Sequence, residues 1–249
     1  MARENSILKL KGKLDGMSFY KTSEGYQVRA RGGIEKARIL NDANFERTRE
    51  NMNEFGNINK AGKLIRASIG VFLNRAKDMR ASSRLVSVAA QVKNLDVTSA
   101  RGQRQFAKGL ETAEGKRLLE GFEFNKHAPL SMILKASYQL DTATGSLSIP
   151  GFHPAEHVVI AEAATHVRLA FACAAINAEN ETRETVYAEQ QLIPTTAGPS
   201  DLTLVLDHLP ELEGALMFYV LVEFFQEMNG EQYILKSGSH NALQLVKVV

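Results

Sequence analysis

The first part of the chain alternates apolar and polar positions in short runs, which is typical of β-strands. Residues 7–14, 17–21 and 26–31 are the predicted strands, separated by turn signals at Asp15-Gly16 and Ser23-Glu24-Gly25. A three-stranded meander with so few apolar residues does not form a core of its own. We therefore expect this small sheet to rest on the following helices, on the C-terminal half or on another subunit.

Residues 34–124 place apolar side chains three or four positions apart, which predicts helices. One helix is expected to begin at Asn41 or Asp42, either of which can act as an N-cap, and to end at Gly56. The clearest helix covers residues 60–80, because Leu64, Ile65, Ile69, Phe72, Leu73 and Ala76 form one apolar stripe. Further helices are predicted at residues 83–93, 99–108 and 112–120.

From Ser131 onward the pattern changes to alternation with a period of two and to short apolar runs. The predicted strands are residues 133–140, 146–149, 157–162, 167–177, 186–193, 203–206, 216–225, 233–236 and 243–248. Many short strands separated by turn signals are typical of an antiparallel sandwich. The sequence thus predicts an α+β fold, with a small N-terminal β-meander, a helical segment and a C-terminal antiparallel β-sandwich.

Charge is divided unevenly along the 249 residues, although the net charge is only +2. Residues 1–127 hold 25 Lys and Arg against 14 Asp and Glu, a net charge of +11. Residues 128–249 hold 5 Lys and Arg against 14 Asp and Glu, a net charge of −9. Since the sign and the periodicity change at the same place, we predict two domains: a basic β-meander and helical domain at 1–127, and an acidic β-sandwich domain at 128–249.

The uneven charge has three interpretations. The two halves can simply carry solvated charged surfaces, the basic half can bind nucleic acid, or it can bind the acidic half of the next copy of the chain. The candidate basic residues for assembly or nucleic-acid binding are Lys13, Lys21, Arg29, Arg31, Arg75, Lys77, Arg80 and Arg84. The candidate acidic residues for assembly are Glu179, Glu181, Glu184, Glu211 and Glu213.

No motif predicts a catalytic, cofactor or metal site. The sequence contains no Gly-x-Ser-x-Gly turn, no phosphate-binding loop and no Gly-x-Gly-x-x-Gly after a predicted strand. His153 and His157 stand four apart, but Pro150 and Pro154 favour a loop rather than a metal-binding helix. The single Cys173 lies in an apolar run and is expected to be buried. We therefore do not expect an enzyme.

Three segments of the N-terminal part resemble segments of other bacterial proteins. They are Gly12 to Lys21, Val28-Arg29, and Phe45 to Asn51. A Gly-Lys-x-x-Gly start, an aromatic-Lys strand and an Arg-x-x-Glu-Asn helix resemble a group of bacterial proteins of no established activity, with phage-like or surface-assembly character. The resemblance covers about the first 70 residues. It implies no catalytic residues, and it favours self-assembly.

The function predicted from these patterns is a non-enzymatic structural subunit. It would self-assemble into a tube, filament or virion-like particle through complementary basic and acidic halves, which makes the chain itself the expected partner. The alternative is a nucleic-acid-binding protein that uses the basic helices. No cofactor is expected, because no cofactor-binding motif is present. No membrane span is expected, since no apolar stretch reaches about 18 residues. We expect cytoplasmic synthesis without a signal peptide, and a place in a released or extracellular assembly stays open.

Overall fold

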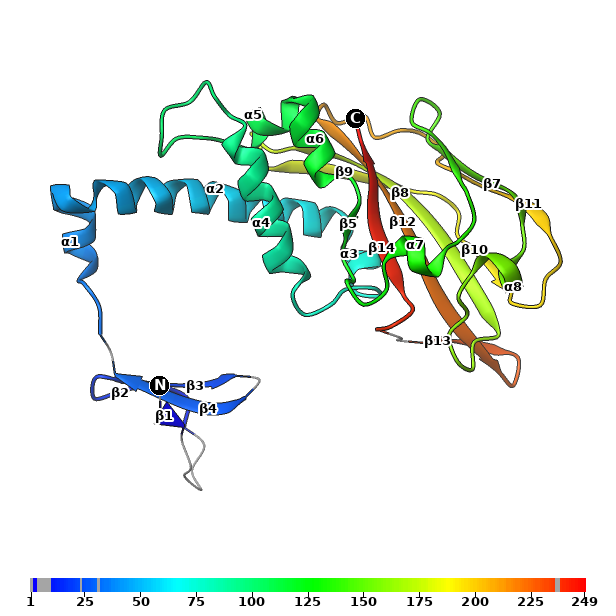
Figure 1. Ribbon diagram of the computed structural model, residues 1–249, viewed down its shortest axis with the longest axis horizontal. Coiled ribbons are helices and arrows are strands. Elements are labelled where there is room, and N and C mark those ends of the chain that lie inside the picture. Colours follow the sequence, from blue (N-terminus) through cyan, green and yellow to red (C-terminus); the bar gives the residue numbers. More distant parts are fainter. Residues whose placement is uncertain (1, 4–9, 23, 31, 236–237) are drawn as a thin grey trace. The chain divides into compact units, whose positions relative to one another are not determined.

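A computed structural model describes residues 2–3, 10–22, 24–30, 32–235 and 238–249 of the chain (Figure 1). The chain folds into two compact units, Met1–Arg49 and Glu50–Val249. Helices and antiparallel sheets are both present, so the predicted α+β class is confirmed.

The N-terminal unit contains a small antiparallel sheet, as predicted. Its strands are β1 (Ala2–Arg3), β2 (Gly12–Leu14), β3 (Met17–Thr22) and β4 (Gly25–Ala30), in the order β1-β4-β3-β2. Strand β1 is not among the predicted strands, and the predicted strand residues 7–9 lie outside the described part. The turn between β2 and β3 contains Asp15 and Gly16, both at positive φ, where glycine is favoured.

A short helix and a turn follow this sheet. They are α1 (Lys36–Asn41) and the 3₁₀ turn η1 (Ala43–Phe45), and α2 (Glu46–Ser68) begins directly after them. The Asp42 side chain accepts a hydrogen bond from the Asn44 N–H at 2.9 Å, which caps the 3₁₀ turn. The Arg49 guanidinium donates to the carbonyl oxygens of Ile39 and Asp42 at 2.9 and 2.8 Å. These bonds fix the chain direction between α1 and α2.

The predicted end of the first helix at Gly56 is wrong, because α2 continues through Gly56 to Ser68. A glycine costs a helix only about 1 kcal/mol relative to alanine. The burial of Ile58, Leu64 and Ile65 in the following turns outweighs that cost. The helix predicted at residues 60–80 is therefore the second half of α2 followed by α3 (Gly70–Leu73).

Three further helices complete one layer of the C-terminal unit. They are α4 (Ala81–Asn94), α5 (Phe106–Glu111) and α6 (Ala113–Leu119). The helices predicted at residues 83–93 and 112–120 are confirmed, and the one predicted at 99–108 begins later, at Phe106. The Thr112 hydroxyl accepts a hydrogen bond from the Gly115 N–H and caps α6.

Seven antiparallel strands form the large sheet of this unit. Its order is β10-β8-β12-β14-β5, with β9 beside β8 and β13 beside β12. The strands are β5 (Phe122–Glu123), β8 (His166–Asn177), β9 (Thr182–Tyr187), β10 (Gln191–Pro194), β12 (Ala215–Met228), β13 (Glu231–Leu235) and β14 (Ala242–Val248).

A second sheet has three strands in the order β11-β7-β6. These are β6 (Gln139–Asp141), β7 (Ser146–Phe152) and β11 (Ser200–Val205), and two single-turn helices lie nearby in sequence, α7 (Leu130–Ile133) and α8 (Pro154–His157). The strand predicted at residues 157–162 is wrong. Pro154 starts a helical turn there, and the segment contributes only an isolated bridge between Leu134 and Val158.

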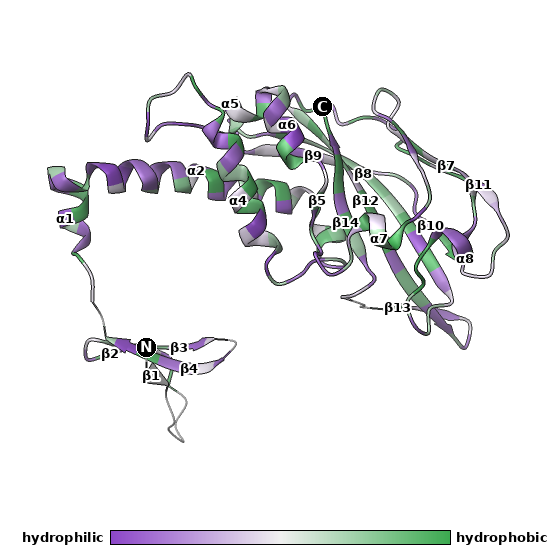
Figure 2. Ribbon diagram, viewed as in Figure 1, coloured by the Kyte–Doolittle hydropathy of each residue, from purple (hydrophilic) through white to green (hydrophobic). Residues whose placement is uncertain are grey.

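The large sheet is buried on both faces. Alternate residues of β8 divide between two cores: Ala170 and Ala172 join the helices, whereas Leu169 and Phe171 join the three-stranded sheet. Figure 2 shows hydrophobic residues concentrated in β8, β12 and the part of α2 nearest to them. Burial on both sides explains the long apolar runs in the sequence of β8 and β12.

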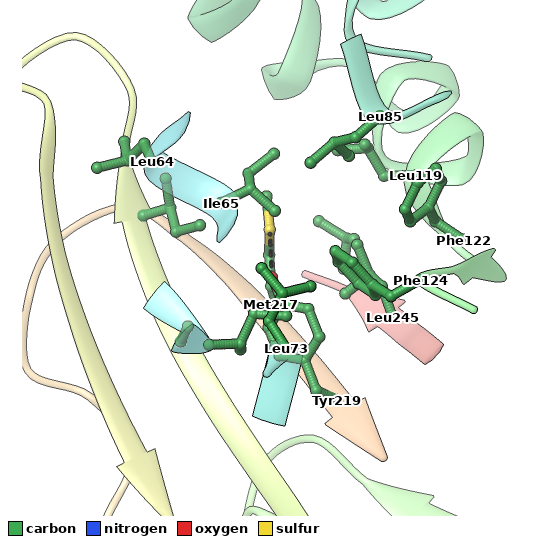
Figure 3. Close-up of a cluster of buried hydrophobic side chains, with 14 of the residues drawn as sticks. Leu64, Ile65, Leu73, Leu85, Leu119, Phe122, Phe124, Met217, Tyr219 and Leu245 are labelled. Carbon is green, nitrogen blue, oxygen red and sulfur yellow. Dashed lines mark hydrogen bonds between the residues drawn. The ribbon is translucent and has the colours of Figure 1, made fainter. Parts of the chain in front are cut away.

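Helices and sheet share one continuous core. Figure 3 shows Leu64 and Ile65 of α2 and Leu85 of α4 near Tyr219 and Leu245 of the sheet. The structure therefore divides the chain after Arg49, and not after residue 127 as the charge pattern predicts. The apolar stripe of the helices holds residues 50–127 on the sheet, while the change of charge at 128 is a property of the surface.

Candidate functional site

Several of the predicted basic residues meet around one hollow of the C-terminal unit. The hollow has a volume of about 750 Å³ and lies beside the loop before α4 and the segment after β5. We call it the basic hollow and define it by Lys77, Arg80, Arg84, Lys126 and His127. Only the first three are among the residues predicted from the sequence. Lys126 and His127 stand more than 40 positions further along, and no sequence pattern links them to the others.

Asp78 organises the basic hollow. Its carboxylate accepts hydrogen bonds from the N–H groups of Arg80 and Lys126, at 2.7 and 2.8 Å, and forms an ion pair with Arg84 at 2.7 Å. Burial alone would raise the pKa of Asp78, but Arg84 and the two N–H groups outweigh it and lower the pKa to about 2. Arg84 also donates to the Glu123 carbonyl oxygen at 2.7 Å. The carboxylate thereby holds the loop before α4 against the segment after β5.

Glu123 lies next to this cluster with an incompletely satisfied carboxyl group. Its Oε1 accepts hydrogen bonds from the Leu130 N–H, at 3.0 Å, and from the Gln244 side chain. Its Oε2 is buried and has no hydrogen-bond partner among the described residues. Burial raises the pKa of Glu123 to about 7, against the lowering effect of these bonds and of Arg84.

The raised pKa of Glu123 predicts that the contribution of this residue to the free energy of unfolding falls as the pH rises. Between about pH 4.5 and pH 7 the folded chain keeps the Glu123 proton that the unfolded chain releases, so folding is favoured at the acidic end of this range. We expect Glu123→Gln to be nearly neutral at pH 5 and to stabilise the protein by about 2–3 kcal/mol at pH 8. Urea unfolding of the wild type and the variant at each pH measures the difference between their free energies of unfolding. The titration of all other groups cancels in this difference. An equal effect of the substitution at both pH values would contradict the prediction.

Predicted acidic residues meet around a second hollow, of about 530 Å³, where β8 ends and β12 begins. Glu111, Glu179 and Glu213 line its polar part together with Lys116. Its apolar part consists of Ala107, Leu110, Ile176, Ala178, Ala215 and Val249. We call this the acidic hollow. None of the three carboxylates has an ion-pair partner in the part of the chain that the structure describes.

The other predicted acidic residues differ in their surroundings. Glu181 forms an exposed ion pair with Lys60 at 2.6 Å, and Glu184 accepts a hydrogen bond from the Leu212 N–H at 2.7 Å. Glu211 is exposed, two positions before Glu213. Glu179 and Glu213 are thus the predicted acidic residues that line the acidic hollow.

Arg75, a predicted basic surface residue, is bound inside the C-terminal unit. Its Nη1 donates to Glu223 at 2.7 Å, and Arg168 Nε donates to the same Glu223 oxygen at 2.7 Å. The Glu223 side chain is completely buried. Arg75 therefore neutralises a buried carboxylate and does not line the basic hollow.

The N-terminal sheet presents two chemically different faces. Pairing places Phe19 opposite Val28 and Met17 opposite both Leu14 and Ala30, which makes one face apolar. The opposite face carries the predicted basic residues Lys13 and Arg29, both of which pair with Ser18. Lys21 belongs to the apolar side, where its Nζ lies 5.8 Å from the centre of the Tyr26 ring. Arg31 lies outside the described residues.

The described residues of the N-terminal unit leave the apolar face of this sheet exposed. None of the described residues from 10 to 49 is buried. Leu14 keeps 63% of its surface exposed and Met17 keeps 44%. A small sheet with an uncovered apolar face needs another surface for stability.

The two histidines at 153 and 157 contact each other without forming a metal site. His153 donates its N–H to His157 Nδ1 at 3.1 Å, and the described residues contain no group of three or more His, Cys, Asp or Glu placed to hold a metal ion. Within the same residues, no helix combines the length and the apolar character that crossing a membrane requires.

Comparison with known proteins adds no relative to this picture. No protein-family model, no curated protein and no solved structure matches the chain.

Proposed function

We propose that the chain is a structural subunit that self-assembles, with the N-terminal sheet of one copy docking into the acidic hollow of the next. The observation that carries the proposal is the apolar face of the sheet, around Leu14 and Met17, which stays exposed among the described residues of its own unit. Exposed apolar faces of this kind are typical of interaction surfaces.

Both chemistry and charge of the acidic hollow suit this sheet. Its carboxylates can meet Lys21, which lies on the apolar side of the sheet. The apolar face can contact the exposed Val249 and the half-buried Ala107, Ala178 and Ala215 of the hollow. Residues 1–49 carry 11 Lys and Arg against 6 Asp and Glu, a net charge of +5. Residues 50–249 carry 19 against 22, a net charge of −3. Opposite charge of the two units speeds their encounter and fixes their orientation.

The contact joins two different surfaces of the chain. Every copy then offers one free sheet and one free hollow, so addition continues until a ring closes or an open filament forms. A tube, a filament or a virion-like shell can be built from such contacts. The electrostatic part of the contact weakens with salt, because exposed charges are screened.

Analytical ultracentrifugation with negative-stain microscopy tests the proposal. At about 50 mM NaCl we expect species larger than the monomer that grow with concentration, and at about 500 mM NaCl smaller species. Two variants should each remain monomeric. Leu14→Asp with Met17→Asp places negative charge on the apolar face of the sheet, and Glu179→Lys with Glu213→Lys reverses the charge of two carboxylates of the acidic hollow.

Mixing these two variants gives the sharpest result. The first keeps an intact hollow and the second an intact sheet, so the mixture should form a dimer that cannot grow. Glu162→Lys with Glu189→Lys is the matched control, because it reverses two exposed carboxylates elsewhere on the C-terminal unit and should assemble normally. A wild-type monomer at high concentration in low salt, or a control that behaves like the hollow variant, would exclude the proposal.

A further inference from the structure

The basic hollow continues into two neighbouring hollows. One shares Arg84 and Lys126 with it and extends along β5. The other shares His127 and adds Lys135 and His240. The extension along β5 is also lined by Glu120 and Glu123 and adds no basic residue of its own. The basic hollow and the extension with Lys135 therefore make up a trough with basic residues along its length, which suits a chain of several phosphate groups better than a single small ion.

The charge of the trough is available for a ligand. Lys77, Arg80 and Lys126 are exposed, and none of them makes an ion pair with the described residues. Arg84 is different, because Asp78 and the Glu123 carbonyl already bind its guanidinium. The basic hollow itself therefore has four cationic side chains against the single carboxylate of Asp78.

The acidic hollow of another copy is a poor occupant for this trough. Both surfaces are concave, so neither can enter the other. A strand of phosphate groups is narrow and convex and carries one negative charge per nucleotide. Such a strand can follow the trough from Arg84 to Lys135.

We propose that the basic hollow and its extension toward Lys135 bind the phosphate backbone of a nucleic-acid strand. Lys77, Arg80 and Lys126 contact phosphate oxygens, and Arg84 holds the trough in shape. Contacts to the backbone carry no base information, so binding is independent of sequence and depends steeply on salt. This inference does not require the chain to self-assemble.

Fluorescence anisotropy with a labelled single-stranded DNA of about 20 nucleotides tests the inference. The variant Lys77→Ala, Arg80→Ala, Lys126→Ala keeps Arg84 and with it the ion pair to Asp78. At about 50 mM NaCl we expect its affinity to fall about tenfold or more, and the slope of log affinity against log salt to become shallower by roughly two. The matched control Lys63→Ala, Arg117→Ala, Arg183→Ala removes three exposed charges of the same unit and should lose less than about threefold.

Three outcomes would overturn the inference. They are no binding of DNA by the wild type at low salt, an equal loss in both triple variants, and binding to vesicles containing phosphatidylserine without binding to DNA. Repeating the titration with Leu14→Asp, Met17→Asp separates the two proposals. That variant should bind DNA normally even if the assembly proposal is correct and it no longer assembles.

Discussion

Replacing Glu223 with alanine is expected to lower the free energy of unfolding by about 3–5 kcal/mol. Glu223 lies on the helix-facing side of β12, with its side chain completely buried between Arg75 and Arg168. The Arg168 guanidinium also lies over the Phe225 ring, 4.3 Å from its centre. Removing the carboxylate leaves two largely buried positive charges side by side without a counter-charge. Urea unfolding followed by circular dichroism measures the loss.

Lys60→Ala provides the control for this prediction. It removes the exposed ion pair with Glu181 and should cost less than about 1 kcal/mol, because water competes for both partners. Equal costs for Glu223→Ala and Lys60→Ala would show that burial does not govern these ion pairs.

Much of the fold can be predicted from local patterns. The apolar spacing of Leu64, Ile65 and Phe72 identifies the helical face that is buried on the sheet, and the long apolar runs identify β8 and β12. These patterns arise from the geometry of single elements, with side chains repeating every 3.6 residues in a helix and every two in a strand. They say nothing about which elements pack together, so they do not predict the division after Arg49.

Charge is the less reliable guide to the site, because its effect depends on distant partners. Arg75 looks like a surface cation in sequence, yet its partner Glu223 stands 148 positions away. Lys77, Arg80 and Arg84 can be predicted together because they share one loop and helix start. Lys126 and His127 join them through hydrogen bonds between distant segments, from the Lys126 N–H to Asp78 and from Arg84 to the Glu123 carbonyl oxygen, which no period or motif reveals.

Two packed helices show how closely packing limits the sequence. A Cβ atom on Gly109 of α5 would lie 1.9 Å from the Val92 carbonyl oxygen at the end of α4. That oxygen belongs to the backbone and cannot turn aside as a flexible side chain can. In an open helix, Gly→Ala stabilises by up to about 1 kcal/mol, so helix propensity and packing act in opposite directions here.

We expect packing to dominate, so that Gly109→Ala destabilises the protein by about 3 kcal/mol. Gly56→Ala is the matched comparison, because Gly56 is also helical, is exposed and has no atom within 4 Å of the added Cβ. That substitution should stabilise by about 0.5–1 kcal/mol. Urea unfolding of the two variants therefore gives shifts of opposite sign for the same chemical change. Stabilisation by both would mean that α5 can move away from α4 at little cost, and that the close approach at Gly109 does not hold this layer together.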